Sequence, residues 1–172
     1  MLLVSPNMQF EQAFQRFYLD YVSNDPLNGE HYAPSLKNFS LYVTRLHDES
    51  QGINLRFGYV PCSHFWFIDE MGEVVGVIRI RHNIEPEFLA LEAGHIGYDI
   101  RPSKRGEGYG KQMLSLALPK ARQLGLRDLL ITANQDNTAS RRVIEANGGQ
   151  FENCIYGDVS QESIARYWIQ LS

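Results

Sequence analysis

The sequence contains little cysteine and no long hydrophobic run, and each absence excludes a class of protein. Only Cys62 and Cys154 occur among its 172 residues, far apart in the chain. Two distant cysteines do not make a disulfide scaffold, so we interpret both as free thiols in a reducing cytoplasm. No apolar run approaches the roughly 20 residues that a membrane-spanning helix requires. We therefore expect a cytoplasmic protein without a membrane-embedded segment.

Basic residues are outnumbered as well. The chain has 16 lysines and arginines against 20 aspartates and glutamates, and its formal net charge is −4. This balance argues against a nucleic-acid partner and is compatible with a cationic substrate. The first residues lack the basic segment of a secretory signal peptide, which again favours the cytoplasm. We expect no metal site.

The spacing of apolar residues predicts one domain over residues 1–172. The length suits a sizeable core, and 44% hydrophobic residues is ordinary for a globular protein. The pattern predicts, in chain order, a strand in 1–5, a helix from Ser5 to about Asn24, a helix capped by Ser35, a hairpin of 62–68 and 73–81, a strand over 94–100, a helix over 108–124, a strand over 127–133, a helix over 138–147 and strands over 150–156 and 164–171. One sheet with helices on both faces suits this order.

Residues 52–61 are unusually apolar for a connecting segment. They carry Ile53, Leu55, Phe57, Tyr59 and Val60 beside two glycines and a proline. Two interpretations stay open: a loop packed over the core, or a wall of a pocket for a substrate.

The stretch from residue 99 to residue 111 is the most informative part of the chain. It leaves a predicted strand, turns at Pro102 and enters a helix with Gly106, Gly108 and Gly110. Arg101, Lys104, Arg105 and Lys111 flank these glycines. A glycine-rich helix N-terminus offers free backbone N–H groups, and glycine allows a ligand to approach the backbone closely. The combination predicts a site for a phosphate or a pyrophosphate.

Two common phosphate-binding patterns do not fit this stretch. The dinucleotide pattern G-x-G-x-x-G, started at Gly106, requires glycine at Lys111. The G-x-x-x-x-G-K-[ST] pattern requires glycine at Arg105 and a hydroxyl residue at Gln112. Both patterns are therefore excluded.

The pattern [Q/R]-x-x-G-x-[G/A] does fit, as Arg105-Gly106-Glu107-Gly108-Tyr109-Gly110. It resembles the coenzyme A pyrophosphate loop of the GNAT N-acetyltransferases. A second stretch, Asn134-x-x-Asn137-x-x-Ser140, continues into a helix that ends at Gly148-Gly149. It resembles the family's Asn-containing segment, which usually ends in Gly-Phe. Segments such as 65–68, 78–82 and 94–103 resemble one bacterial branch of this family, and that likeness supplies no substrate.

The resemblance implies an α+β fold with a central mixed, mostly antiparallel sheet and helices on both faces. It implies transfer of the acetyl group of acetyl-CoA to a primary amine of a small molecule or peptide. The implied roles are main-chain contacts to the thioester and pantetheine by Tyr98 and Ile100, pyrophosphate binding by Gly106, Glu107, Gly108, Tyr109, Gly110 and Lys111, contacts to the phosphates by Lys104, Arg105 and Lys111, and contacts to the pantetheine arm by Asn134, Asn137 and Ser140.

The residues that would move protons are less clear from the sequence. Gly94 stands where the family often has a catalytic carboxylate, so His95, Asp99 and Glu92 become the candidate bases. A structural role for His95 is equally open.

The family's usual acid, a tyrosine, aligns with Ile144. Tyr98, Tyr156, Tyr167 or water are the alternatives. These departures keep a second hypothesis open, an acyl-CoA-binding module without transfer activity. The acceptor, the acyl-chain preference and the oligomeric state, a homodimer included, are not determined by the sequence.

Overall fold

The computed structural model describes residues 1–171 and places seven strands in one sheet, in the order β1-β2-β3-β4-β5-β7-β6. Its strands are β1 (Leu2–Val4), β2 (Cys62–Ile68), β3 (Val74–Arg81), β4 (Ile96–Ile100), β5 (Asp128–Asn134), β6 (Gln150–Tyr156) and β7 (Ser163–Gln170). Neighbouring strands are antiparallel except β4 and β5, which are parallel. The predicted mixed, mostly antiparallel sheet is confirmed.

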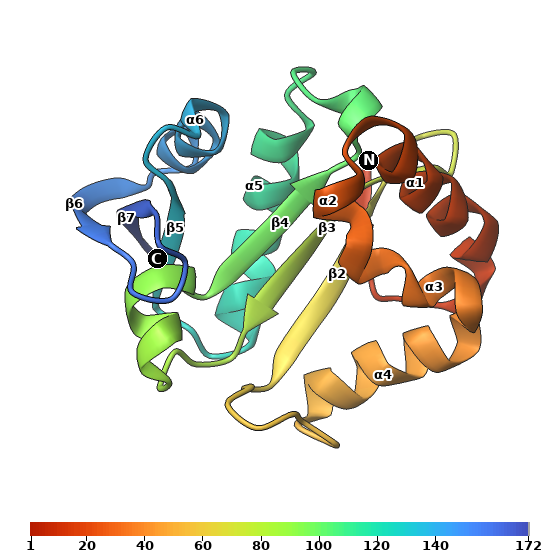
Figure 1. Ribbon diagram of the computed structural model, residues 1–172, viewed down its shortest axis with the longest axis horizontal. Coiled ribbons are helices and arrows are strands. Elements are labelled where there is room, and N and C mark those ends of the chain that lie inside the picture. Colours follow the sequence, from red (N-terminus) through yellow and green to blue (C-terminus); the bar gives the residue numbers. More distant parts are fainter. Residues whose placement is uncertain (172) are drawn as a thin grey trace.

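Helices cover both faces of this sheet (Figure 1). They are α1 (Glu11–Asn24), α2 (Pro26–Gly29), α3 (Pro34–Lys37), α4 (Phe39–Gln51), α5 (Tyr109–Gln123) and α6 (Thr138–Ala146), with short 3-10 turns at Met8–Phe10, Glu30–Tyr32 and Pro102–Lys104 and a π-helical turn at Leu89–Ala93. Within residues 1–171, no helix is long and apolar enough to cross a membrane.

Each face of the sheet has its own core because successive side chains of a strand point to opposite sides. In β2, Trp66 packs with Phe14 and Phe17 of α1, in a cluster that includes the aromatic residues of α4. Its neighbour Phe67 packs with Met113 of α5 in the other cluster. The continuous aromatic run of β2 therefore serves both cores, as the sequence predicts.

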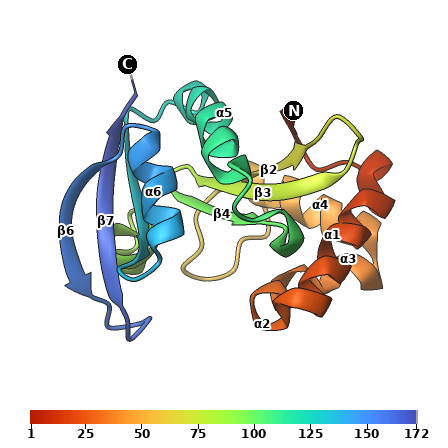
Figure 2. The same cartoon turned by 90° about the horizontal axis from the view of Figure 1, so that it is seen from above.

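The sheet opens between β4 and β5. Only Ile96 and Ile131 are paired along these two strands, and Figure 2 shows β5, β7 and β6 turned away from β2–β4. Main-chain groups of successive strand residues point to alternate sides. Because the N–H of Arg101 donates to Val75 of β3, the main-chain groups of Tyr98 and Ile100 face the opening. Those groups have no partner strand in β5.

The N-terminal helices differ in detail from their prediction. Ser35 does not cap the second helix: it lies within α3, and its hydroxyl donates to the carbonyl of Tyr32. The cap is Asn38, whose side chain accepts the N–H of Leu41 at the start of α4. Such a cap contributes about 1 kcal/mol. The first helix also begins later than predicted, at Glu11, after a 3-10 turn that Asn7 caps.

The structure also decides the form of two connecting segments. The loop 52–61 is not packed over the core, because Ile53, Phe57 and Tyr59 are all exposed. The strand predicted from residue 94 begins at Ile96, and the segment before it, predicted as loop, forms the π-helical turn. Gly94 has φ +63, a left-handed conformation that interrupts the extended backbone and so delays the strand.

Candidate active site

The glycine loop between β4 and α5 exposes its backbone. Gly106 and Gly108 have φ +82 and φ +84, a region that side chains with a Cβ rarely adopt. No atom lies within 4 Å of where a Cβ would stand at either residue, so neither glycine is required by packing. Gly110 differs, because a Cβ there would meet Val143 of α6 at 3.2 Å. The loop therefore leaves the first N–H groups of α5 open to a ligand.

A cavity of about 550 Å³ lies beside this loop; we call it the glycine-loop cavity. It is bounded by the open edge of β4, the loop and the start of α6. Of the residues predicted to bind coenzyme A, those that line it are Tyr98, Ile100, Lys104, Arg105, Gly106, Gly108, Tyr109, Gly110, Lys111, Asn137 and Ser140. Two do not line it: Glu107 faces a neighbouring hollow, and Asn134 donates to Glu162 beside another.

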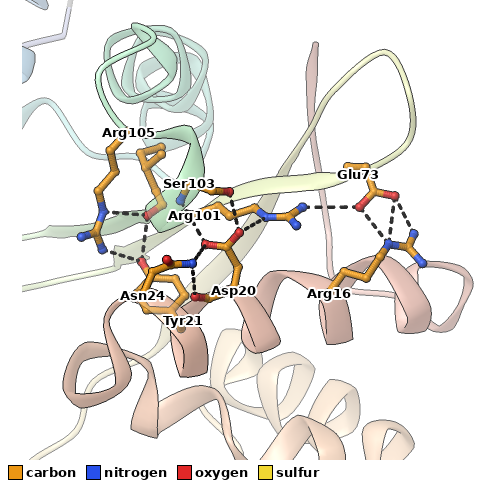
Figure 3. A network of polar contacts seen from close by, with 9 residues as sticks. Arg16, Asp20, Tyr21, Asn24, Glu73, Arg101, Ser103 and Arg105 are labelled. Carbon is orange, nitrogen blue, oxygen red and sulfur yellow. Dashed lines mark hydrogen bonds and ion pairs between the residues drawn. The ribbon is translucent and has the colours of Figure 1, made fainter.

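A network of ion pairs fixes the entrance of the loop against α1 (Figure 3). Asp20 accepts hydrogen bonds from the guanidinium of Arg101 and from the N–H and hydroxyl of Ser103, at 2.5 to 3.0 Å. Glu73 joins Arg101 to Arg16 of α1. These bonds tie the turn after β4 to a long helix, and the backbone of the loop is held in place before any ligand binds.

Arg105 belongs to this structural network. Its guanidinium donates to Asp25 at 2.7 Å, to the hydroxyl of Tyr21 at 3.4 Å and to the carbonyl of Ile100 at 3.2 Å. Most of its donors are therefore used within the protein. The side-chain ammonium groups of Lys104 and Lys111 form no hydrogen bond or ion pair within residues 1–171, and both residues line the glycine-loop cavity. They are the cations free to meet phosphate groups.

The opposite wall of this cavity comes from α6. Asn137 caps this helix by accepting the N–H of Ser140 through its side-chain oxygen, which leaves its amide donor for the cavity. The hydroxyl of Tyr98 lies 2.8 Å from the hydroxyl of Ser140. Burial raises the pKa of Tyr98 to about 12, so its phenol keeps its proton at neutral pH.

A second cavity, of about 440 Å³, lies on the α4 face of the sheet; we call it the arginine cavity. Its charged and titratable lining is Arg45, Arg56, Arg79, Arg81, His31, His64 and Glu49, together with the aromatic rings of Tyr32, Tyr42, Tyr59 and Trp66. The residues come from the turn before α3, from α4, from the loop 52–61 and from β2 and β3. The exposed loop is thus part of a pocket wall, the second of its two predicted interpretations.

Asp99 stands where the two cavities meet. It lines the glycine-loop cavity, while its carboxylate accepts hydrogen bonds from Tyr32 at 2.7 Å and from Arg79 at 3.0 Å, two residues of the arginine cavity. Its burial opposes ionisation, but the nearby His31 imidazole, Arg79 and Tyr32 outweigh it and hold the pKa of Asp99 well below its usual value. Asp99 is therefore a stable negative charge rather than a group that readily takes up a proton.

This geometry, an exposed glycine loop beside an unpaired strand edge, occurs in a chain that matches a known family model. The model of the acetyltransferase (GNAT) domain matches residues 11–150. The chain belongs to the GNAT acetyltransferase family. The predicted family and fold are both confirmed.

A curated relative of this GNAT chain is the uncharacterized N-acetyltransferase YycN of Bacillus subtilis, 31% identical over 91 residues. The match spans 52% of this chain and 57% of the relative, so it covers little more than half of that protein.

Solved structures resemble nearly the whole chain. Mycobacterium smegmatis RimJ in complex with a coenzyme A disulfide has a TM-score of 0.71 at 21% identity, covering 98% of this chain and 80% of that one. The ribosomal alpha-N-protein acetyltransferase RimL in complex with coenzyme A has a TM-score of 0.70 at 20% identity, covering 98% and 93%. A mutant of the Vibrio cholerae spermidine N-acetyltransferase SpeG has a TM-score of 0.65 at 15% identity, covering 100% and 96%. Identities this low show a shared fold.

The position of the usual GNAT tyrosine carries no polar group here. Ile144 is fully buried, and a Cβ at Gly149 would stand 2.4 Å from its Cγ2, a distance that demands glycine. The two departures from the family's wording, Ile144 and Gly149, therefore pack against each other.

Among the tyrosines considered as replacements, Tyr156 donates to the carbonyl of Gln161 and Tyr167 donates to Glu145. Neither lines the glycine-loop cavity, and Tyr98 does.

Glu92 and His95, two of the predicted bases, have structural partners. The N–H groups of Val159 and Ser160 donate to Glu92 and hold its pKa below the usual value. His95 accepts the N–H of Leu130 through Nδ1, and burial lowers its pKa. Neither lines either cavity. His95 instead supplies an acceptor to β5 at the point where β4 and β5 begin to separate, the structural role left open by the sequence.

Seven residues of the arginine cavity with basic or acidic side chains were not foreseen: His31, Arg45, Glu49, Arg56, His64 and the two arginines of β3. His64 lies 2.7 Å from Glu49, and burial lowers the pKa of its imidazole. His31 sits in a segment that reads only as a turn. The alternation of β3, Ile78-Arg79-Ile80-Arg81, is the one signal that could have located polar side chains on this face.

Proposed function

We propose that this protein transfers the acetyl group of acetyl-CoA to a primary amine of a small molecule or peptide by direct attack. The observation that carries the proposal is the position of Asp99, which joins a cavity lined by an open strand edge and a glycine loop to a second cavity lined by side chains. Each substrate then has its own cavity, and Asp99 connects them because it lines the first and bonds Tyr32 and Arg79 of the second. The solved relatives named as protein and spermidine acetyltransferases support an amine as acceptor.

The glycine-loop cavity fits coenzyme A by the chemistry of its donors. The open positions around Gly106 and Gly108 let a pyrophosphate approach the backbone N–H groups of the loop. Lys104 and Lys111 would pair with phosphate oxygens. The main-chain groups of Tyr98 and the N–H of Ile100 face the opening and would bind the pantetheine amides as an added strand does. The carbonyl of Ile100 already accepts hydrogen bonds from Arg105 and Tyr21. Asn137 and Ser140 would line the other side, and Arg105 would hold the loop rather than the ligand.

Proton transfer requires an acceptor near the amine. An alkylammonium has a pKa of about 10.4, so its deprotonation at pH 7 costs roughly 4–5 kcal/mol. His31 is the candidate that the geometry favours: its side chain is 51% exposed, it lines the arginine cavity, and its Nε2 lies 3.8 Å from Asp99. Imidazole is the most frequent general base in enzymes. Asp99 would orient the ring and stabilise it when protonated.

The departing thiolate requires a proton donor, and Tyr98 is the proposed one. Its phenol stays protonated at neutral pH, and it lies in the cavity where its own main chain would bind the thioester. Donation by Tyr98 would leave a phenolate, which Ser140 is placed to stabilise through its hydroxyl. The proton taken by His31 exchanges with solvent through the exposed side of the ring.

The deciding experiment measures free thiol released from acetyl-CoA across a panel of amines, with the acetylated amine identified by mass. Release that depends on the amine supports transfer. The alternative, a module that only binds acyl-CoA, predicts a rise in melting temperature with acetyl-CoA but no release with any amine. Failure of acetyl-CoA at millimolar concentration to raise the melting temperature would contradict both.

His31→Gln tests the proton acceptor once an amine has been found. We expect kcat to fall by about 10²-fold, a usual scale for a general base, with an unchanged dissociation constant for coenzyme A. His47→Gln is the matched control, because its ring is hydrogen-bonded to the carbonyl of Pro6 and it lines neither cavity. Equal losses in the two variants would remove His31 from the mechanism. The cytoplasmic location and the oligomeric state stay predictions.

A further inference from the structure

The arginine cavity has an electrostatic character opposite to that of the chain. The protein carries a formal net charge of −4, yet four arginines converge on this cavity: Arg45, Arg56, Arg79 and Arg81. Only one carboxylate, Glu49, belongs to its lining, and Asp99 adds a second behind Arg79. Two positive charges are therefore not balanced within the lining, before either histidine is counted. The weak expectation of a cationic substrate does not agree with this pocket.

The arginines keep donors that the protein does not use. The Nε of Arg45 is buried without a hydrogen-bond partner within residues 1–171, and its nearest carboxylate, Glu49, lies 3.8 Å away. Arg81 uses one terminal nitrogen on the carbonyls of Ala93 and Gly94. A buried guanidinium N–H is costly unless it meets an acceptor, so this arrangement calls for one from a ligand or from water.

Arg79 brings one of these charges to the junction of the cavities. It lies on β3 opposite Gly97 of β4, where a Cβ would stand 3.1 Å from its Nε. The missing side chain lets the guanidinium lie across β4, where Asp99 and Tyr32 fix it. An acceptor bound by the arginines would thus reach toward the opening between β4 and β5.

We propose that the acceptor is an amino acid-like small molecule, an amine that also carries a carboxylate, and that Arg45 and Arg56 with the β3 arginines bind that carboxylate. Arginine matches a carboxylate because its planar donors can form two parallel hydrogen bonds. The volume of about 440 Å³ suits a small molecule with an apolar part against Tyr42 and Tyr59. The phosphates of coenzyme A do not account for this charge, because the glycine loop has its own cations. The inference rests on the proposed acetyl transfer.

The test compares amines that differ only in the carboxylate. Phenylalanine is paired with phenethylamine and leucine with isoamylamine, and spermidine is the polycation of the set. We expect kcat/KM to be about 10- to 100-fold higher for the acid of at least one pair, the scale of one or two charge-assisted hydrogen bonds. Equal values within both pairs, or a preference for spermidine, would overturn the inference while leaving acetyl transfer intact.

Variants locate the binding groups. Arg45→Gln and Arg56→Gln should each lower the ratio of kcat/KM between the acid and its partner amine by several-fold, whereas Arg45→Lys should keep most of it. Arg127→Gln is the matched control, since Arg127 lines neither cavity. An unchanged ratio in both glutamine variants contradicts the assignment.

Binding gives a readout that does not need turnover. With coenzyme A present, N-acetylphenylalanine should raise the melting temperature and N-acetylphenethylamine should not. If no amine is acetylated at all, the proposed function fails, and this measurement still decides whether the cavity binds a carboxylate.

Discussion

The glycine-loop cavity and the arginine cavity differ in the groups that line them. The glycine-loop cavity presents the backbone of one continuous segment, 98–111, and is completed by α6 with its cap and by Asp25 and Asn28. The arginine cavity is made of side chains contributed by five separate segments between residues 31 and 81. A ligand with phosphates and amides suits the first, because repeating N–H groups recognise it. Selection of one particular substrate requires side chains, as in the arginine cavity, because each side chain recognises one chemical feature of the substrate.

The largest expected effect comes from filling the backbone-lined cavity. Gly108→Val should weaken coenzyme A binding by at least ~100-fold, because a branched side chain would occupy the place of the pyrophosphate and strain a residue at φ +84. Isothermal titration with coenzyme A measures the loss.

Gly125→Val separates these two causes. Gly125 has φ +86 and open space around its missing Cβ, so valine imposes similar strain outside the site. Coenzyme A should bind this control as it binds the unaltered protein. Equal binding by both variants would mean that the pyrophosphate lies elsewhere.

The next largest effect separates catalysis from coenzyme A binding in the glycine-loop cavity. Tyr98→Phe should lower kcat by about 10²-fold or more, as expected for loss of a general acid, and leave the affinity for coenzyme A unchanged. Steady-state kinetics with the best amine and titration of coenzyme A are the two measurements. Tyr156→Phe is the control, because that hydroxyl contacts only the carbonyl of Gln161. Near-normal turnover of Tyr98→Phe would leave water as the donor.

A smaller change should affect the side-chain cavity alone. Gly97→Ala places a methyl group 3.1 Å from Arg79, which must shift away from Asp99 and Tyr32. We expect kcat/KM for the amine to fall by ~10-fold, about 1.4 kcal/mol, while coenzyme A binds normally. Arg79→Lys should behave similarly, because lysine cannot hold both partners at once. A loss of coenzyme A affinity would show that the two cavities are not independent.

The smallest expected effect concerns how the stability of the folded chain depends on pH. Burial lowers the pKa of His95, His64 and His82 below the ordinary 6.5, so the unfolded chain binds protons that the folded chain refuses. Their neutral forms contribute stability fully above about pH 6.5. That contribution is lost as the pH falls through this value toward the lower folded pKa.

Urea unfolding at pH 7.5 and pH 5.5 measures this dependence. The unaltered protein should be less stable at pH 5.5, and His95→Asn should reduce the difference by a small part of the roughly 5–15 kcal/mol total. His47→Gln controls for the removal of one histidine. A difference that His95→Asn does not change would assign the pH dependence to the other two histidines.

The sequence by itself determined the order of elements, the mixed sheet and the glycine-loop cavity. Its signals are local: a turn at Pro102, glycines at required positions and a helix directly after them fix an exposed backbone suited to a phosphate within about a dozen residues. Eleven of the thirteen residues predicted for coenzyme A line that cavity, and the two exceptions, Glu107 and Asn134, each line a different hollow. Local signals also explain the error near Ser35. Ser35 and Asn38 are both suitable caps, and the sequence does not show which of them begins the helix.

Only the tertiary structure decided which side chains meet. His31 and Asp99 are far apart in the sequence, as are Glu49 and His64, and each pair forms because strands of one sheet carry α4 and the turn before α3 on the same face. The sequence offers His95, Glu92 and Asp99 alike as candidate bases. In the structure, main-chain N–H groups donate to His95 and Glu92, which therefore have structural partners. A side chain's role depends on its neighbours in space and on the burial they impose, and neither is encoded in the residue type or in its immediate spacing.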